Sequence, residues 1–129
     1  MAKAEGRSYN FLPESKIDTK ALETIKYDGG NQLIEYKTRE FSAVCPFSGL
    51  PDVAEVVITY IPSAKILELK ALKYYFVSFR NVGIYQEKAT DRIFSDIKKI
   101  LNPKYLLVET IYNTRGGIDA KCAMEFGKR

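Results

Sequence analysis

The stretch from Ile66 to Asn81 changes its hydrophobic period halfway along, and this change constrains the fold more than any other feature of the sequence. Leu67 and Leu69 alternate with charged residues, as at the end of a strand, whereas Leu72 and Phe76 recur at helical spacing. A strand that leads into a helix is typical of a binding site, because the helix N-terminus presents free N–H groups. An ordinary amphipathic helix with solvated lysines is the alternative explanation of the same pattern.

Two strands are predicted before this stretch and two after it. Residues 31–41 alternate apolar and polar side chains, and residues 54–61 are rich in β-branched residues, so we expect an antiparallel hairpin. A second hairpin is expected from strands over 105–112 and 118–126, and a helix after Gly83 precedes it. The order strand, strand, helix, helix, strand, strand predicts an α+β fold with mostly antiparallel pairing.

The first part of the chain is polar and irregular. Residues 1–30 contain Pro13 and the pair Gly29-Gly30, so we interpret them as a partly ordered lead-in to a single domain over residues 31–129. Asp18 is expected to cap a short helical turn that runs through Tyr27.

The composition narrows the possible functions. The chain has 129 residues and no run of 18 apolar residues, and its N-terminus has no apolar signal core, so we expect a cytoplasmic protein without a membrane anchor. Its net charge of +4 fits a phosphorylated cofactor as well as RNA, and no basic arm points to nucleic acid. The absence of histidine excludes His-based triads and His-rich zinc sites, and no metal site is predicted.

The segment between the first two predicted strands, residues 43–52, is a candidate site for chemistry. Two prolines and a glycine give this loop a fixed, irregular shape, and Cys45 lies within it. A cysteine on such a loop is a candidate nucleophile, although a small buried filler is the alternative. Cys122 lies on an alternating strand and is interpreted as structural.

Two motifs resemble those of one enzyme family. The octapeptide from Glu68 to Tyr75 reads Glu-Leu-Lys-Ala-Leu-Lys-Tyr-Tyr, and Cys45-Pro-Phe-Ser-Gly-Leu-Pro-Asp52 keeps the pattern Cys-Pro-x-x-Gly-x-Pro-Asp. Together they resemble the NADPH-dependent 7-cyano-7-deazaguanine reductases, the nitrile reductases of queuosine biosynthesis. The resemblance implies the tunnelling fold (T-fold), ββααββ, with a four-stranded antiparallel sheet, two helices on one face, and residues 31–129 as the catalytic domain.

The resemblance also assigns roles to residues. It implies that Cys45 adds to the substrate nitrile to form a thioimide and that Asp52 shuttles protons, which suits the soft nucleophile that a nitrile carbon requires. It implies a 7-deazapurine pocket lined by Leu67, Glu68 and Leu69.

Glu87 is expected to clamp the guanine-like edge of the substrate, beside Gln86, where the family usually has histidine. Glutamine can donate and accept hydrogen bonds but does not titrate.

The cofactor assignment follows from the same resemblance. NADPH is expected to contact Leu69, Lys70, Lys73, Arg115 and Gly116, because ammonium and guanidinium groups bind phosphate and glycine allows close approach. Solvated lysines and an ordinary glycine turn are the alternatives. Family members form rings with active sites between subunits, so we expect a homo-oligomer.

The expected activity is reduction of 7-cyano-7-deazaguanine to 7-aminomethyl-7-deazaguanine with two NADPH. Two alternatives stay open. One is a reductase-like amidinotransferase that acts on 7-cyano-7-deazaguanine in tRNA, and the other is a purine- or RNA-binding module without catalysis. Cys45→Ala would leave the function of the binding module unchanged.

Overall fold

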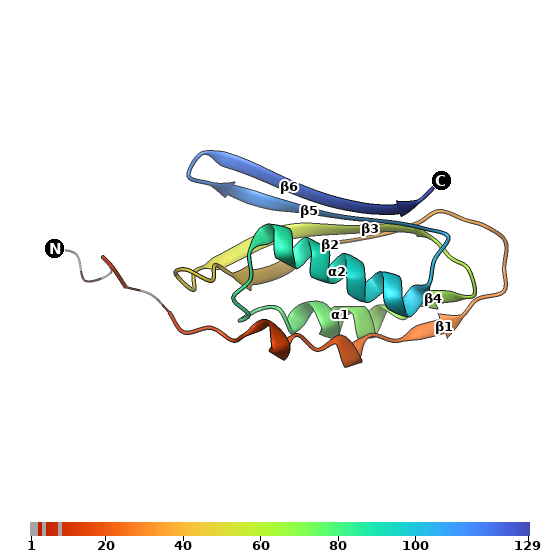
Figure 1. Cartoon of the computed structure of the whole chain (residues 1–129), viewed down its shortest axis with the longest axis horizontal. Helices are drawn as coiled ribbons and strands as arrows, with labels where there is room; N and C mark the ends of the chain where they lie inside the picture. Colours follow the sequence, from red (N-terminus) through yellow and green to blue (C-terminus); the bar gives the residue numbers. More distant parts are fainter. Residues whose placement is uncertain (1–2, 4, 8) are drawn as a thin grey trace.

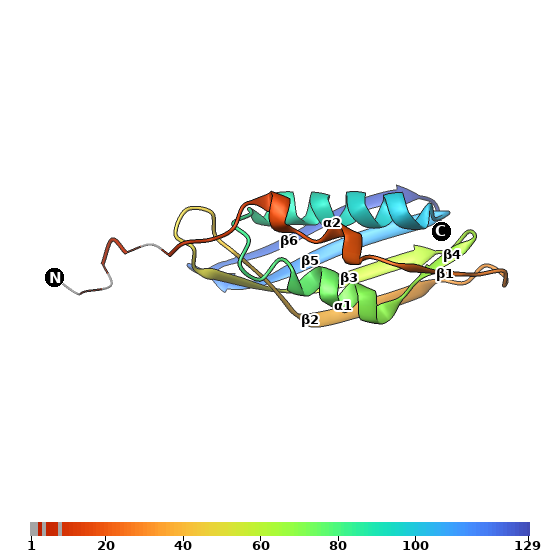
Figure 2. The same cartoon turned by 90° about the horizontal axis from the view of Figure 1, so that it is seen from below.

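One antiparallel sheet and two helices make up most of the molecule. The computed structural model describes Lys3, residues 5–7 and residues 9–129. Strands β2 (Ile34–Val44), β3 (Pro51–Ile61), β5 (Tyr105–Arg115) and β6 (Ile118–Gly127) form the sheet in the order β2-β3-β5-β6. Helices α1 (Leu69–Val77) and α2 (Gln86–Leu101) both lie on one face of it (Figures 1 and 2). The predicted α+β architecture is confirmed.

The segment before β2 differs from the prediction. In place of a helical turn from Asp18 to Tyr27, the chain forms two short 3-10 helices, η1 (Glu14–Lys16) and η2 (Thr19–Ala21), followed by β1 (Thr24–Lys26). β1 pairs in an antiparallel manner with β4 (Lys65–Leu67), so pairing with a distant segment overrides the local helical pattern. The Asp18 side chain forms no capping hydrogen bond.

The first hairpin is tighter than the sequence suggested. β2 and β3 pair as far as Val44 and Pro51, so the connecting loop contains only residues 45–50. Asp52 therefore lies within β3, opposite Ala43, and its backbone is held by the sheet. Pro51 is tolerated because it occupies the first position of its strand.

The core lies between the sheet and the two helices. Tyr75 of α1 and Ile93 and Ile97 of α2 have no exposed surface, and they pack with sheet residues such as Ile58 and Val108. Burying a large aliphatic side chain stabilises a fold by about 1.5–3 kcal/mol, so this layer holds the helices on the sheet.

The topology separates two ends of the molecule. The loop over residues 45–50, the turn between β5 and β6, and the start of α2 lie at one end (Figure 1). β4 and the start of α1 lie at the other end. No helix among the described residues is long and apolar enough to cross a membrane.

Candidate active site

The loop that carries Cys45 is held by backbone hydrogen bonds. The Cys45 N–H donates to the Leu50 carbonyl at 2.8 Å, and the Gly49 N–H donates to the Cys45 carbonyl at 2.7 Å. Gly49 has φ +74°, and a Cβ there would lie 2.3 Å from the Tyr9 carbonyl oxygen. The Tyr9 N–H donates to Ser48 at 2.9 Å, so the N-terminal segment packs directly on the loop. This packing gives Cys45 a fixed position.

The environment of Cys45 favours its thiolate. The backbone N–H of Ser48 is the largest influence and lowers the pKa of the Cys45 thiol below the usual 9.0. Partial burial opposes this shift, while the Phe47 N–H, the Ser48 hydroxyl and the charge of Arg115 add to it. A thiol with a lowered pKa is more nucleophilic at neutral pH because more of it is ionised.

Asp52 forms an ion pair with Arg115 beside this loop. The Asp52 side chain is only 9% exposed, and Arg115 also donates from Nη1 to the Pro51 carbonyl at 3.4 Å. A carboxylate so far out of water requires a charged or hydrogen-bonding partner, and the arginine provides it. The Arg115 guanidinium, which was expected to bind NADPH, is thus paired in this structure with Asp52, the predicted proton shuttle. Gly116 follows it with φ +58° and open space around its Cα.

Backbone hydrogen bonds hold the segment just before α2 against the end of β2 that precedes Cys45. The Val44 N–H donates to Val82 at 3.0 Å, and the Ile84 N–H donates back to Val44 at 3.1 Å, so this short segment lies beside the residue that precedes Cys45. Gln86 and Glu87 follow as the first residues of α2. The structure therefore brings Cys45, Asp52, Gln86, Glu87, Arg115 and Gly116 to one end of the molecule.

The other predicted site residues lie far from Cys45 within the chain. The Leu67 N–H donates to the Tyr60 hydroxyl at 3.1 Å, which places Leu67 at the far end of β3. Tyr60 follows Asp52 by eight positions in that strand, which corresponds to about 26 Å at ~3.3 Å per residue. Leu67, Glu68, Leu69 and Lys70 thus form a second group of predicted site residues, which we call the second half-site, at the opposite end of the chain from Cys45.

Glu68 has a structural partner in this second half-site. Its carboxylate accepts hydrogen bonds from the N–H groups of Lys70 at 3.0 Å and Ala71 at 2.7 Å, so it caps α1. A carboxylate at this position also interacts favourably with the helix dipole. Leu69, the next residue, is 53% exposed, which leaves its side chain free to meet a ligand or a neighbouring subunit.

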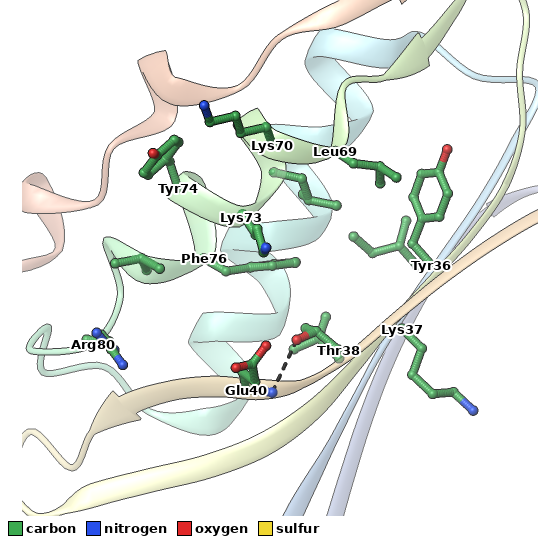
Figure 3. A pocket seen from close by; sticks show the side chains of 14 residues that line it. Tyr36, Lys37, Thr38, Glu40, Leu69, Lys70, Lys73, Tyr74, Phe76 and Arg80 are labelled. Atoms are coloured by element: carbon green, nitrogen blue, oxygen red, sulfur yellow. Dashed lines mark hydrogen bonds between the residues drawn. The ribbon is translucent and has the colours of Figure 1, made fainter.

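A groove of about 810 Å³ runs between α1 and β2. Lys70, Lys73 and Arg80 line its α1 side (Figure 3), and among the described residues none of the three is in an ion pair. Free cations around a concave surface fit a phosphorylated cofactor. Sequence reasoning missed Arg80, although its spacing of seven residues from Lys73 was a signal for one helical face.

Comparisons with known proteins identify the family of this chain. A family model described as QueF-like protein matches residues 51–129. A relative from Thermotoga petrophila named NADPH-dependent 7-cyano-7-deazaguanine reductase is 56% identical over 96% of this chain and 91% of its own. One of the same name from Caldicellulosiruptor bescii is 47% identical over 98% of both chains.

A solved structure also resembles the chain. The crystal structure of the archaeosine synthase QueF-Like in the apo form matches with a TM-score of 0.69 and 29% identity over 75% of this chain and 95% of that one. From the family model and the relatives together, the chain belongs to the QueF-like family of NADPH-dependent 7-cyano-7-deazaguanine reductases.

Proposed function

We propose that this protein reduces the nitrile of 7-cyano-7-deazaguanine to an aminomethyl group at the expense of two NADPH, as a step in tRNA queuosine biosynthesis. The observation that carries the proposal is Cys45, a thiol of lowered pKa on a fixed loop beside the buried Asp52. The names of the relatives supply the substrate and the cofactor.

Cys45 starts the reaction. Its sulfur attacks the nitrile carbon, so that a carbon–sulfur bond forms and one carbon–nitrogen π bond breaks. The nitrogen then needs one proton, and Asp52 relays the proton that the thiol gives up. The product of this step is a thioimide on Cys45. A thiolate suits the step because it is the softest nucleophile that a protein offers to a weak electrophile.

Arg115 keeps Asp52 in place for this relay. The ion pair fixes the carboxylate at the start of β3, directly after the loop that carries Cys45. The carboxylate therefore does not have to be ordered when the substrate arrives, which lowers the cost of reaching the reactive arrangement.

Substrate recognition is shared between the two half-sites. Glu87 accepts hydrogen bonds from the ring N–H and amine of the deazaguanine, and Gln86 beside it donates or accepts without titrating. Leu67, Glu68 and Leu69 of a neighbouring copy complete the pocket. Glu68 would then serve both the substrate and the N-terminus of α1.

NADPH is held by side chains from both half-sites. Lys70 and Lys73 would hold its phosphates, Leu69 would contact it, and Arg115 with Gly116 would bind it from the end of the molecule that carries Cys45. When bound, NADPH supplies one hydride in each of the two reductions. Each of the two reductions also takes up one proton from solvent, and the carbon–sulfur bond breaks between them, with the sulfur keeping the bond's electrons and taking a proton, so that the Cys45 thiol is regenerated.

The enzyme works as a homo-oligomer in the cytoplasm. Apart from a bridge between Val44 and Gly83, the outer edges of β2 and β6 pair with no other described strand, and open edges favour pairing between copies. A ring built in this way brings the Cys45 half-site of one subunit to the Leu67–Lys70 half-site of the next. No direct contact with nucleic acid is needed.

An amidinotransferase is the second candidate, because the similar solved structure is that of an archaeosine synthase. Such an enzyme would use Cys45, Asp52 and the base pocket but would not need NADPH. The retained cations Lys70, Lys73 and Arg115 favour the reductase.

The test mixes the protein with 7-cyano-7-deazaguanine and NADPH and follows cofactor absorbance and intact mass. We expect two NADPH oxidised per substrate and a mass adduct that Cys45→Ala abolishes. Cys122→Ala is the matched control and should keep both signals. An adduct without NADPH oxidation would indicate the amidinotransferase, and neither signal would indicate the binding module.

A further inference from the structure

The groove between α1 and β2 offers more than the two lysines of the family motif. Its floor is apolar and includes Leu72, Phe76 and Val56, while Lys73 and Arg80 stand on its rim. Concave sites with an apolar floor and a few charged groups are typical of small-molecule binding. A ligand with a flat ring and at least one phosphate would fit both parts of this surface.

Arg80 stands out among the cations near the groove. Figure 3 shows its guanidinium at the end of the groove away from Leu69, while Glu40 lines the groove from β2. Within the described part of the chain Arg80 makes neither an ion pair nor a side-chain hydrogen bond. Lys37 of β2, by contrast, points away from α1. Arg80 is therefore a free planar donor that faces the groove.

The order of residues along α1 gives the groove a direction. Leu69 begins the helix, Lys73 follows one turn later, and Arg80 lies beyond the last turn. The helix rises about 12 Å between Leu69 and Val77, at ~1.5 Å per residue. A ligand that lies along the groove therefore has one end at Leu69 and the other at Arg80, with Lys73 between them.

We propose that this groove holds the adenosine half of NADPH and that Arg80 binds the 2′-phosphate, so that Arg80 decides the preference for NADPH over NADH. The inference rests on the proposed function, in which Leu69 meets both substrate and cofactor. Hydride transfer requires the nicotinamide to touch the substrate, so the nicotinamide lies at Leu69. The 2′-phosphate, at the opposite end of an extended dinucleotide, lies at Arg80.

Arginine suits this task better than lysine. Its planar fork makes two parallel hydrogen bonds to phosphate, which gives both affinity and orientation. Glu40, which lines the same groove from β2, opposes phosphate binding, because a carboxylate repels a phosphate. Removing the charge of Arg80 should therefore weaken binding of the phosphate, whereas removing the charge of Glu40 should strengthen it.

The test measures binding by calorimetry, without turnover, with adenosine 2′,5′-bisphosphate and adenosine 5′-monophosphate as probes. Wild-type protein should bind the bisphosphate more tightly. Arg80→Gln should weaken bisphosphate binding about tenfold and leave the monophosphate almost unchanged, since a charge-assisted bond is lost only with the 2′-phosphate. Glu40→Gln should strengthen bisphosphate binding. Lys37→Gln removes the same charge from a side chain that points away from α1 and should change neither probe.

The same variants separate this proposal from the proposed function. If wild-type protein oxidises NADPH with its substrate but Arg80→Gln and Lys37→Gln keep the same preference for NADPH over NADH, the role of Arg80 is wrong and the reductase stands. If no cofactor is oxidised, the reductase fails, while the calorimetry still tests the groove. Equal binding of the bisphosphate to Arg80→Gln and wild type, with both folded by thermal melting, overturns the proposal.

Discussion

Cys45 owes its lowered pKa chiefly to the backbone of its own loop. The Ser48 N–H is the main cause, and the charge of Arg115 is the smallest of the contributions. Backbone donors are fixed by the fold, so the thiolate is stabilised before any substrate binds. The chemistry of the residue therefore depends on the shape of the loop.

This dependence predicts a pH profile. In a Cys122→Ser background, the rate of Cys45 alkylation by iodoacetamide should have its inflection below pH 9.0, because the lowered pKa keeps the thiolate populated as the pH falls. The rate should decline only when the pH drops through this lowered value. In concentrated urea the loop donors are lost, so the inflection should move upward. The same inflection in native and unfolded protein would contradict the assignment.

At the scale of elements, Asp96 joins both helices to the N-terminal segment. Its Oδ2 accepts hydrogen bonds from the Tyr75 hydroxyl of α1 at 2.7 Å, from Arg92 Nε at 2.9 Å and from the Thr19 hydroxyl at 3.3 Å. Burial, followed by the charge of Asp96, raises the pKa of Tyr75, so this hydroxyl stays protonated as a donor. The contacts fix α1 against α2 and hold η2 over both.

Removing the Asp96 carboxylate should loosen this arrangement. Asp96→Ala leaves the Tyr75 hydroxyl buried without its partner, which should lower the free energy of unfolding by about 2–3 kcal/mol. Asp91→Ala on the same helix is the control, and because Asp91 is exposed it should change stability by less than about 0.5 kcal/mol. Urea denaturation measures both, and equal losses would show that the network contributes nothing specific.

At the scale of the whole molecule, the proposed function requires residues from two copies of the chain. Cys45 and Leu67 lie at opposite ends of β3, so the proposed function predicts that a complete site forms only where two subunits meet. The double variant Lys70→Gln/Lys73→Gln and the variant Cys45→Ala damage different halves. Each should be inactive alone.

Mixing the two inactive variants should restore activity. If the copies assort randomly in a ring, about a quarter of the interfaces carry both intact halves, so activity should reach roughly a quarter of the wild-type rate. NADPH oxidation measures the recovery after joint unfolding and refolding. A mixture that stays inactive, although mass spectrometry detects mixed oligomers, would place the whole site within one chain.

The sequence by itself determined the element order and the family. Alternation over residues 31–41 and the helical spacing of Leu72 and Phe76 come from side-chain burial with fixed periods, so the α+β order could be predicted. The two motifs that include Cys45 and Lys70 indicated the family for the same reason, since a motif is local. Local periodicity could not predict where each helix and strand ends, or the structure of the segment from Asp18 to Tyr27.

Only the tertiary structure decided which residues meet. β1 replaced the predicted helical turn because β4, which lies far along the chain and begins at Lys65, offers it a partner. Arg115 pairs with Asp52 because the β3–β5 register brings the two strand ends together, and nothing near either residue in the sequence shows this. Arg80 lines a groove because β2 runs beside α1. Contacts between distant segments depend on strand register and helix packing, which are properties of the folded chain.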